Sequence, residues 1–157
     1  MQHVSRILVV LAAVVLAGCS SFDRRFAAAS RVRAKDDPCA GAYAGKWSSS
    51  QHPGGGGELR CIVTAASSTE RRGGRDYRAD FHARWHGFSS EHSVVLHTKP
   101  SRKGRGVRDF SGTSEIRMFI GSGTYRCEGA MDGDQMRACY DATYDKGTFD
   151  LMRARTE

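Results

Sequence analysis

Short segments with alternating apolar and polar side chains follow one another along most of the chain. In residues 76–85, DYRADFHARW, aromatic residues and alanines occupy every second position, and charged residues or histidine occupy the positions between them. Successive side chains of a strand point to opposite faces, so this period of two predicts a β-strand with one buried face. The same alternation recurs in residues 58–63, 123–131 and 135–142.

Turn-forming clusters separate these segments at regular intervals. Residues 51–57, 99–106 and 131–134 are rich in glycine, proline, serine or aspartate, which favour tight turns. Five more segments have strand-like composition: residues 42–49, 92–98, 108–113, 115–120 and 147–153. Beyond residue 38 no stretch keeps the apolar spacing of a helix. Eight or nine short strands therefore predict an all-β fold, either an antiparallel sandwich or a closed barrel.

The first residues have a different pattern. A cation, Arg6, precedes an uncharged apolar run at residues 7–18. A mature membrane span needs about 20 apolar residues, so this run is too short to be one. It has the length of a signal-peptide core, and small residues precede the next cysteine as a cleavage site requires. We therefore expect an exported protein from which residues 1–18 are removed.

The sequence LAGC, residues 16–19, resembles the lipobox of bacterial lipoproteins at all four positions. The resemblance implies that Cys19 becomes the first residue, bears diacylglycerol and is acylated at its amino group. Two or more acyl chains hold a protein on a membrane without spanning it. Ser20 stands where an inner-membrane retention signal has aspartate, so the resemblance implies an outer-membrane anchor with the domain facing the periplasm. An ordinary signal peptide that contains a cysteine is the alternative.

The expected cleavage divides the chain into a signal peptide at 1–18, a lipidated tether at 19–38 and one domain at 39–157. The tether is basic and poor in large apolar side chains, so it cannot bury enough surface to fold alone. We expect it to be flexible, with at most a helical turn within residues 24–33. The remainder has a suitable length for a single core.

The sequence AGKW, residues 44–47, resembles the G-x-W motif that opens the first strand of lipocalins and their calycin relatives. The resemblance implies an antiparallel up-and-down barrel of about eight strands, in which a basic residue near the end of the barrel packs across the tryptophan. Arg153 shares a face with Phe149 and Leu151, so we expect it to cover Trp47. A cation over an indole contributes about 0.5–2 kcal/mol. Plain core packing of Trp47 is the alternative.

Four cysteines remain after lipidation of Cys19: Cys39, Cys61, Cys127 and Cys139. An even number in an exported domain predicts two disulfides. No pair has the C-x-x-C spacing common in zinc sites, so a zinc site is the weaker interpretation.

The turn at residues 131–134 suggests which cysteines pair. A two-residue turn would set Met131 opposite Asp134, which points Cys127 into the barrel and Cys139 out of it. Directly opposed side chains share a face, so these two cysteines are not expected to bond to each other. We predict the disulfides Cys61–Cys127 inside and Cys39–Cys139 outside.

The candidate chemical groups do not assemble into a predicted active site. Four histidines lie on neighbouring segments: His82, His86, His92 and His97. We expect them on a solvated outer face beside arginines that would repel a metal ion, so no metal site is predicted. Ser89 and Ser90 lie near His92, but no carboxylate is placed to orient the histidine and there is no G-x-S-x-G motif. We predict neither an enzyme nor a cofactor; an enzyme would require Ser90, His92 and His97 to converge with a carboxylate.

Large rings on the expected inward faces are the candidate ligand-binding residues. They are Trp47, Tyr77, Phe81, Trp85, Tyr125 and Tyr140. An eight-stranded barrel either fills its interior with side chains or leaves room for one ligand. We therefore predict a small apolar ligand or an envelope-structural role, and an interior void would favour the ligand.

Basic loops support a second hypothesis, in which the domain docks on anionic envelope components or a protein partner. The chain has a net charge of +7. The candidate anion-binding residues are Lys99, Arg102, Lys103, Arg105 and Arg108, and the loop at 70–75 adds Arg71, Arg72 and Arg75. Each cation near an anionic surface contributes about 1 kcal/mol. Nucleic acid is scarce in the periplasm and is not an expected partner.

Overall fold

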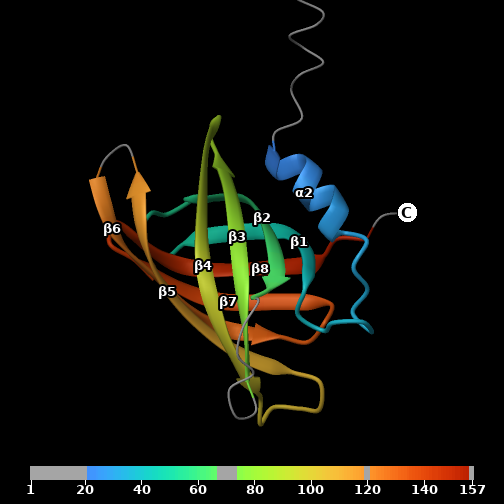
Figure 1. Cartoon of the computed structure of the whole chain (residues 1–157). Coiled ribbons are helices and arrows are strands. Elements are labelled where there is room, and N and C mark those ends of the chain that lie inside the picture. The colour runs from blue at the N-terminus through green and yellow to red at the C-terminus, as the bar shows by residue number, and fades with distance from the viewer. Residues whose placement is uncertain (1–20, 67–73, 119–120, 156–157) are drawn as a thin grey trace, which may run out of the picture.

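The computed structural model describes residues 21–66, 74–118 and 121–155. These residues form one helix, α2 (Ser21–Ala29), and a closed barrel of eight strands in chain order (Figure 1). The strands are β1 (Gly41–Ser49), β2 (Gly56–Ala65), β3 (Arg75–Trp85), β4 (Phe88–Pro100), β5 (Arg108–Met118), β6 (Gly121–Met131), β7 (Gln135–Ala142) and β8 (Asp145–Arg153). Neighbouring strands are antiparallel, and β8 pairs with β1. The predicted all-β up-and-down barrel is confirmed.

The period of two in the sequence fixes which side chains face the interior. Tyr77, Ala79 and Phe81 on β3 are all buried in the core, as the alternation predicts. The two segments expected at 108–113 and 115–120 contribute to the single strand β5, so the barrel has eight strands rather than nine.

The two ends of the barrel differ. We call the end with the β1–β2, β3–β4, β5–β6 and β7–β8 connections the open end, and the opposite end the closed end. At the closed end the Arg153 side chain donates hydrogen bonds to the carbonyl oxygens of Ala40 (2.6 Å) and Pro38 (3.0 Å) and to that of Gly133. It also donates to the Tyr43 hydroxyl at 2.8 Å. Arg153 thus ties the last strand to the segment before β1.

The expected contact between Arg153 and Trp47 is wrong. The Arg153 guanidinium lies over the Tyr43 ring, with its central carbon 5.0 Å from the ring centroid. In the β1–β8 ladder Tyr43 is opposite Arg153, whereas Trp47 is opposite Phe149. Four residues of strand separate Tyr43 from Trp47 by about 13 Å. Trp47 therefore lies toward the open end, out of reach of Arg153.

The described part of the expected tether is docked on the barrel. Phe22 of α2 is completely buried, and its ring stacks on His82 of β3 at 4.9 Å. The Arg60 guanidinium covers the same ring at 5.1 Å, and Arg25 forms an ion pair of 2.5 Å with Asp80. The segment lacks a core of its own, as its composition predicts, but the buried Phe22 ring and the ion pair of Arg25 hold its helix against the outer wall. The described residues of the expected tether therefore include a helix that contacts the barrel.

Neither predicted disulfide is present, because all four described cysteines are free. Cys61 on β2 and Cys127 on β6 both face the interior, but their strands are on opposite walls of the eight-stranded barrel. Cys39 is buried at the closed end and Cys139 is exposed, so the wall separates them. The predicted faces of Cys127 and Cys139 are correct; shared orientation alone does not bring Cα atoms within the roughly 7 Å that a disulfide needs.

The β6–β7 turn is longer than expected. Met131 pairs with Met136, not with Asp134, which moves the register by two residues and leaves the faces unchanged. The Asp132 carboxylate accepts hydrogen bonds from the backbone of Asp134 (3.1 Å) and Gln135 (2.9 Å). Aspartate commonly stabilises turns by such bonds to the following backbone.

The ladder between β4 and β5 is incomplete. Its pairs run from Pro100 opposite Arg108 at the closed end to Leu96 opposite Gly112, and no pair continues between Val94 and Ser114. Beyond that point the β3–β4 and β5–β6 hairpins diverge toward the open end (Figure 1). Backbone pairing between β4 and β5 therefore stops about halfway along β4, while the other seven ladders continue around the barrel.

Candidate functional site

A cavity of about 410 Å³ occupies the open end of the barrel, and all eight strands contribute to its lining. Its walls are mostly aromatic or aliphatic: Trp47, Leu59, Phe81, Trp85, Ile116, Tyr125, Tyr140 and Phe149. Ligand pockets commonly measure about 300–1,000 Å³ and have mainly apolar walls. The cavity therefore has the size and composition of a small-molecule site.

Aromatic rings in contact with one another form the walls of the cavity from its base to its mouth. At the base Phe81 packs edge-on against Phe149, with centroids 5.5 Å apart. Tyr125 and Tyr140 stack at 6.1 Å along one side. Trp47 meets Trp85 edge to face at 6.2 Å nearer the mouth. Such contacts fix the ring orientations, so the cavity is largely formed without a ligand.

Five of the six predicted ligand residues line this cavity. They are Trp47, Phe81, Trp85, Tyr125 and Tyr140. The sixth, Tyr77, is buried nearer the closed end, where its hydroxyl donates to the Asp37 carboxylate at 3.1 Å. Tyr77 faces the same interior as Phe81 but lies four residues further down β3, below the base of the cavity.

His92 is the polar residue that the sequence interpretation misplaced. It faces inward from β4, stacks on Phe81 at 5.2 Å and meets the edge of Tyr125 at 4.6 Å. Burial lowers the pKa of His92 to about 4, so the imidazole is neutral at pH 7. Its Nε2 atom is buried without a hydrogen-bond partner among the described residues, as is Nε1 of Trp47.

A second polar group lies at the mouth. The Tyr140 hydroxyl donates to Oδ2 of Asp145 at 2.6 Å, and the Ser49 hydroxyl donates to Oδ1 of the same carboxylate at 2.6 Å. Burial and this hydrogen bond raise the pKa of Tyr140. No lysine or arginine is among the described residues that line the cavity. The site thus suits an uncharged ligand with one or two hydrogen-bonding groups.

The residues that an enzyme would require do not converge. Ser90 and His92 both line the cavity, but His97 lies on the outer face, where its Nδ1 atom is 2.8 Å from the Asp76 carboxylate. His82 is also on the outer face, under Phe22. Within the described ranges no three histidine, cysteine or acidic side chains are grouped closely enough to hold a metal ion.

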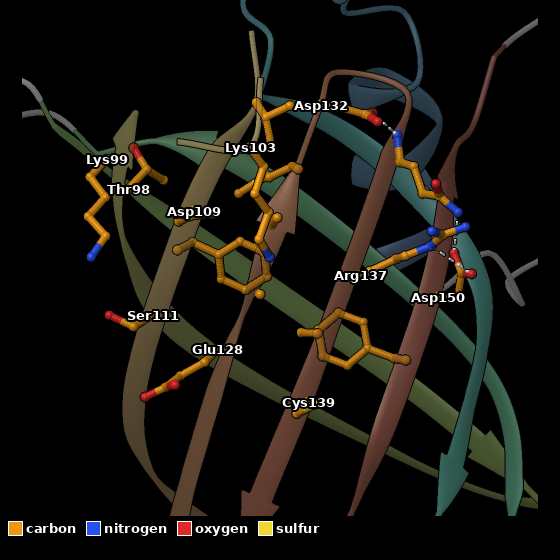
Figure 2. Close-up of a pocket in the computed structure, with 18 of the residues that line it drawn as sticks. Thr98, Lys99, Lys103, Asp109, Ser111, Glu128, Asp132, Arg137, Cys139 and Asp150 are labelled. Carbon is orange, nitrogen blue, oxygen red and sulfur yellow. Dashed lines mark hydrogen bonds and ion pairs between the residues drawn. The ribbon is translucent and has the colours of Figure 1, made fainter. Parts of the chain in front are cut away.

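A larger depression, of about 1060 Å³, lies on the outer face of the wall from β4 to β8 (Figure 2). Lys99 and Lys103 share it with the carboxylates of Asp109 and Glu128. Arg137 and Asp150 also line the depression and form an ion pair, with Nε of Arg137 3.1 Å from Oδ2 of Asp150. Positive and negative side chains alternate over this surface, so it lacks the single sign of charge that an anion site needs.

The predicted anion-binding residues differ in their exposure and in their contacts. Lys99, Arg102, Lys103 and Arg105 are exposed and form no ion pair with another described residue. Arg108 is half-buried at the closed end, where its charge acts on the Cys39 thiol. In the other loop Arg75 pairs with Asp37 at 3.3 Å. Arg71 and Arg72 lie outside the described residues.

Comparison of the chain with known protein families, with curated proteins and with solved structures finds no match. In the described part of the chain, no helix has the length and hydropathy required to cross a membrane.

Proposed function

We propose that the protein is a lipid-anchored envelope lipoprotein whose barrel binds one small, uncharged, mostly apolar ligand without catalysing a reaction. The cavity of about 410 Å³ at the open end is the observation that carries this proposal. An eight-stranded barrel either fills its interior with side chains or holds one small ligand, and a cavity of this size favours the second case. The lipobox-like residues 16–19 support acylation at Cys19, and this anchor would hold the domain at the periplasmic face of the outer membrane.

Filling the cavity tests the binding proposal. Ala83 and Ala142 line it, so the double variant Ala83→Phe/Ala142→Phe should remove much of the free volume. We expect the affinity for the neutral fluorescent probe N-phenyl-1-naphthylamine to fall about tenfold or more, a change equivalent to 1.4 kcal/mol. Fluorescence titration of the full chain measures the affinity.

Ala130→Phe is the matched control, because Ala130 belongs to the outer depression and not to the cavity. This variant should bind the probe like the unaltered chain. Equal probe affinity in the double variant, with its circular dichroism spectrum unchanged, would exclude the cavity as the binding site.

A second candidate function is favoured by the exposed cations of the β4–β5 loop. In this hypothesis Arg102, Lys103 and Arg105 bind anionic lipid head groups or lipopolysaccharide phosphates. Replacing all three with serine should weaken association with anionic vesicles about 100-fold, since each cation contributes about 1 kcal/mol near such a surface. Sedimentation with vesicles at several salt concentrations measures this association.

The control for the loop variant removes the same charge elsewhere. Arg31, Lys46 and Arg126 are exposed and lie outside the loop. Serine at these three positions should weaken binding only slightly if the loop is a specific contact. Equal losses in the two triple variants would mean that net charge, not the loop, attracts the protein to the vesicles.

A further inference from the structure

The tip of the β3–β4 hairpin presents aromatic side chains to solvent beside the mouth of the cavity. Phe88 is 61% exposed, the highest value among the large apolar side chains of the described residues. Its ring centroid lies 6.3 Å from that of the half-buried Trp85. Only His86 and Gly87, both with positive φ, separate the two rings in sequence. The tip therefore presents two aromatic rings, and residues 85–88 include no acidic side chain.

The described chain begins beside this hairpin. Phe22, the second residue of α2, stacks on His82, which lies three residues before Trp85 on β3. Three residues of strand span about 10 Å. From Phe22 the helix runs toward the closed end, where the Val32 carbonyl accepts a hydrogen bond from Arg153. The first turn of α2 and the hairpin tip consequently point to the same side of the molecule (Figure 1).

The length of chain before α2 limits which surface can reach a membrane. Cys19 is two residues before Ser21, and two residues span at most about 7 Å. An acyl anchor at Cys19 would thus enter the bilayer close to the start of α2. The β4–β5 loop belongs to the closed end, away from this point. Of the exposed large apolar side chains, Phe88 and Tyr144 lie at the open end. Phe88 belongs to the hairpin of β3, the strand whose His82 contacts Phe22 of α2.

We propose that the tip of the β3–β4 hairpin docks on the lipid bilayer, with Trp85 and Phe88 in the interfacial region. Aromatic side chains are favoured at this depth because their apolar bodies leave water while polar atoms stay hydrated. Docking brings the mouth of the cavity, which Trp85 lines, against the bilayer surface. The proposal rests on the membrane anchoring proposed above and adds the orientation of the barrel and the surface it uses.

The chain has two tryptophans, so quenching of indole fluorescence by brominated lipids can test whether the hairpin tip reaches the bilayer. The full-length protein, isolated from its native membrane, is reconstituted into phosphatidylcholine–phosphatidylglycerol vesicles with or without bromine on the acyl chains. In the Trp47→Phe variant all indole emission comes from Trp85. We expect bromine to quench about half of this emission, because the indole would lie at the boundary of the acyl region.

Further variants separate docking from simple proximity. Phe88→Ser in the same background should reduce the quenching at least about twofold, since it removes the most exposed apolar group of the tip. Met152→Ser is the matched control: Met152 is 54% exposed on β8 and follows Leu151 near the closed end, so quenching should not change. Amide hydrogen exchange at residues 84–89 should also slow on reconstitution. This measurement uses the chain without substitutions, so an effect of a variant on folding cannot explain its result.

Two results overturn the proposal in distinguishable ways. If the protein floats with the vesicles but Trp85 emission is the same with and without bromine, the anchor stands and the docking of the tip is wrong. If the protein does not float with the vesicles, the anchoring fails, and the docking proposal fails with it.

Discussion

Replacing Arg153 with methionine should lower the free energy of unfolding by about 3–4 kcal/mol. The Arg153 side chain is only 9% exposed and donates to the carbonyls of Ala40, Pro38 and Gly133 and to the Tyr43 hydroxyl. Methionine would leave these acceptors buried without a donor, at a cost of about 1–3 kcal/mol for each group that water cannot reach. Equilibrium unfolding in urea measures the loss.

Arg137→Met is the matched control for this prediction. Arg137 is also a strand arginine near the closed end, but its side chain is 66% exposed and its ion pair with Asp150 is open to solvent. Exposed pairs of this kind contribute about 0–1 kcal/mol. Similar losses for the two variants would show that Arg153 does not hold the closed end together.

Acidification from pH 7 to pH 4 should destabilise the protein by about 3 kcal/mol through His92. Burial lowers the pKa of this imidazole from 6.5 to about 4 in the folded state. Between these two values the unfolded chain binds a proton at His92 that the folded chain does not bind. Stability is therefore complete above pH 6.5 and falls as the pH decreases toward 4, at 1.36 kcal/mol per pH unit.

His92→Phe should remove this part of the pH dependence, because phenylalanine keeps a ring at the position and does not titrate. Unfolding in urea at pH 7, 5.5 and 4.5 measures the dependence in both chains. His82 titrates in the same direction, since burial and the Arg60 charge lower its pKa, so the variant should keep a smaller slope. An identical slope in the variant and the unaltered chain would place His92 in contact with water.

The barrel itself could be predicted because alternation of side chains is a local property of the sequence. The same property placed Cys127 inside and Cys139 outside and identified five rings of the cavity. The alternation does not show how far along the barrel axis a residue lies, because that position depends on the stagger between neighbouring strands. For this reason the alternation groups Tyr77 with the cavity rings although it lies below them, and it does not distinguish Tyr43 from Trp47 as the partner of Arg153.

His92 shows a different limit of the sequence pattern. In residues 92–98, HSVVLHT, apolar side chains occupy both phases, because Val94 and Leu96 face the core while Val95 is 45% exposed. The alternation therefore does not decide which face His92 occupies. The face is decided by the pairing of His92 with Phe81 on β3, because directly opposed residues point to the same side of the sheet. Disulfide pairing has the same limit, since it requires knowledge of which strands are neighbours.

The incomplete ladder between β4 and β5 determines how the barrel can deform. Its last pair, Leu96 with Gly112, is at a position where a Cβ on residue 112 would lie 2.7 Å from the Val95 carbonyl oxygen. Beyond it no backbone pair of the described residues joins the β3–β4 hairpin to the β5–β6 hairpin, although β3 still pairs with β2 as far as Arg84 and β6 with β7 as far as Tyr125. Among the described residues this is the shortest of the eight ladders, so an opening of the wall would start here and would widen the mouth of the cavity between the two hairpins.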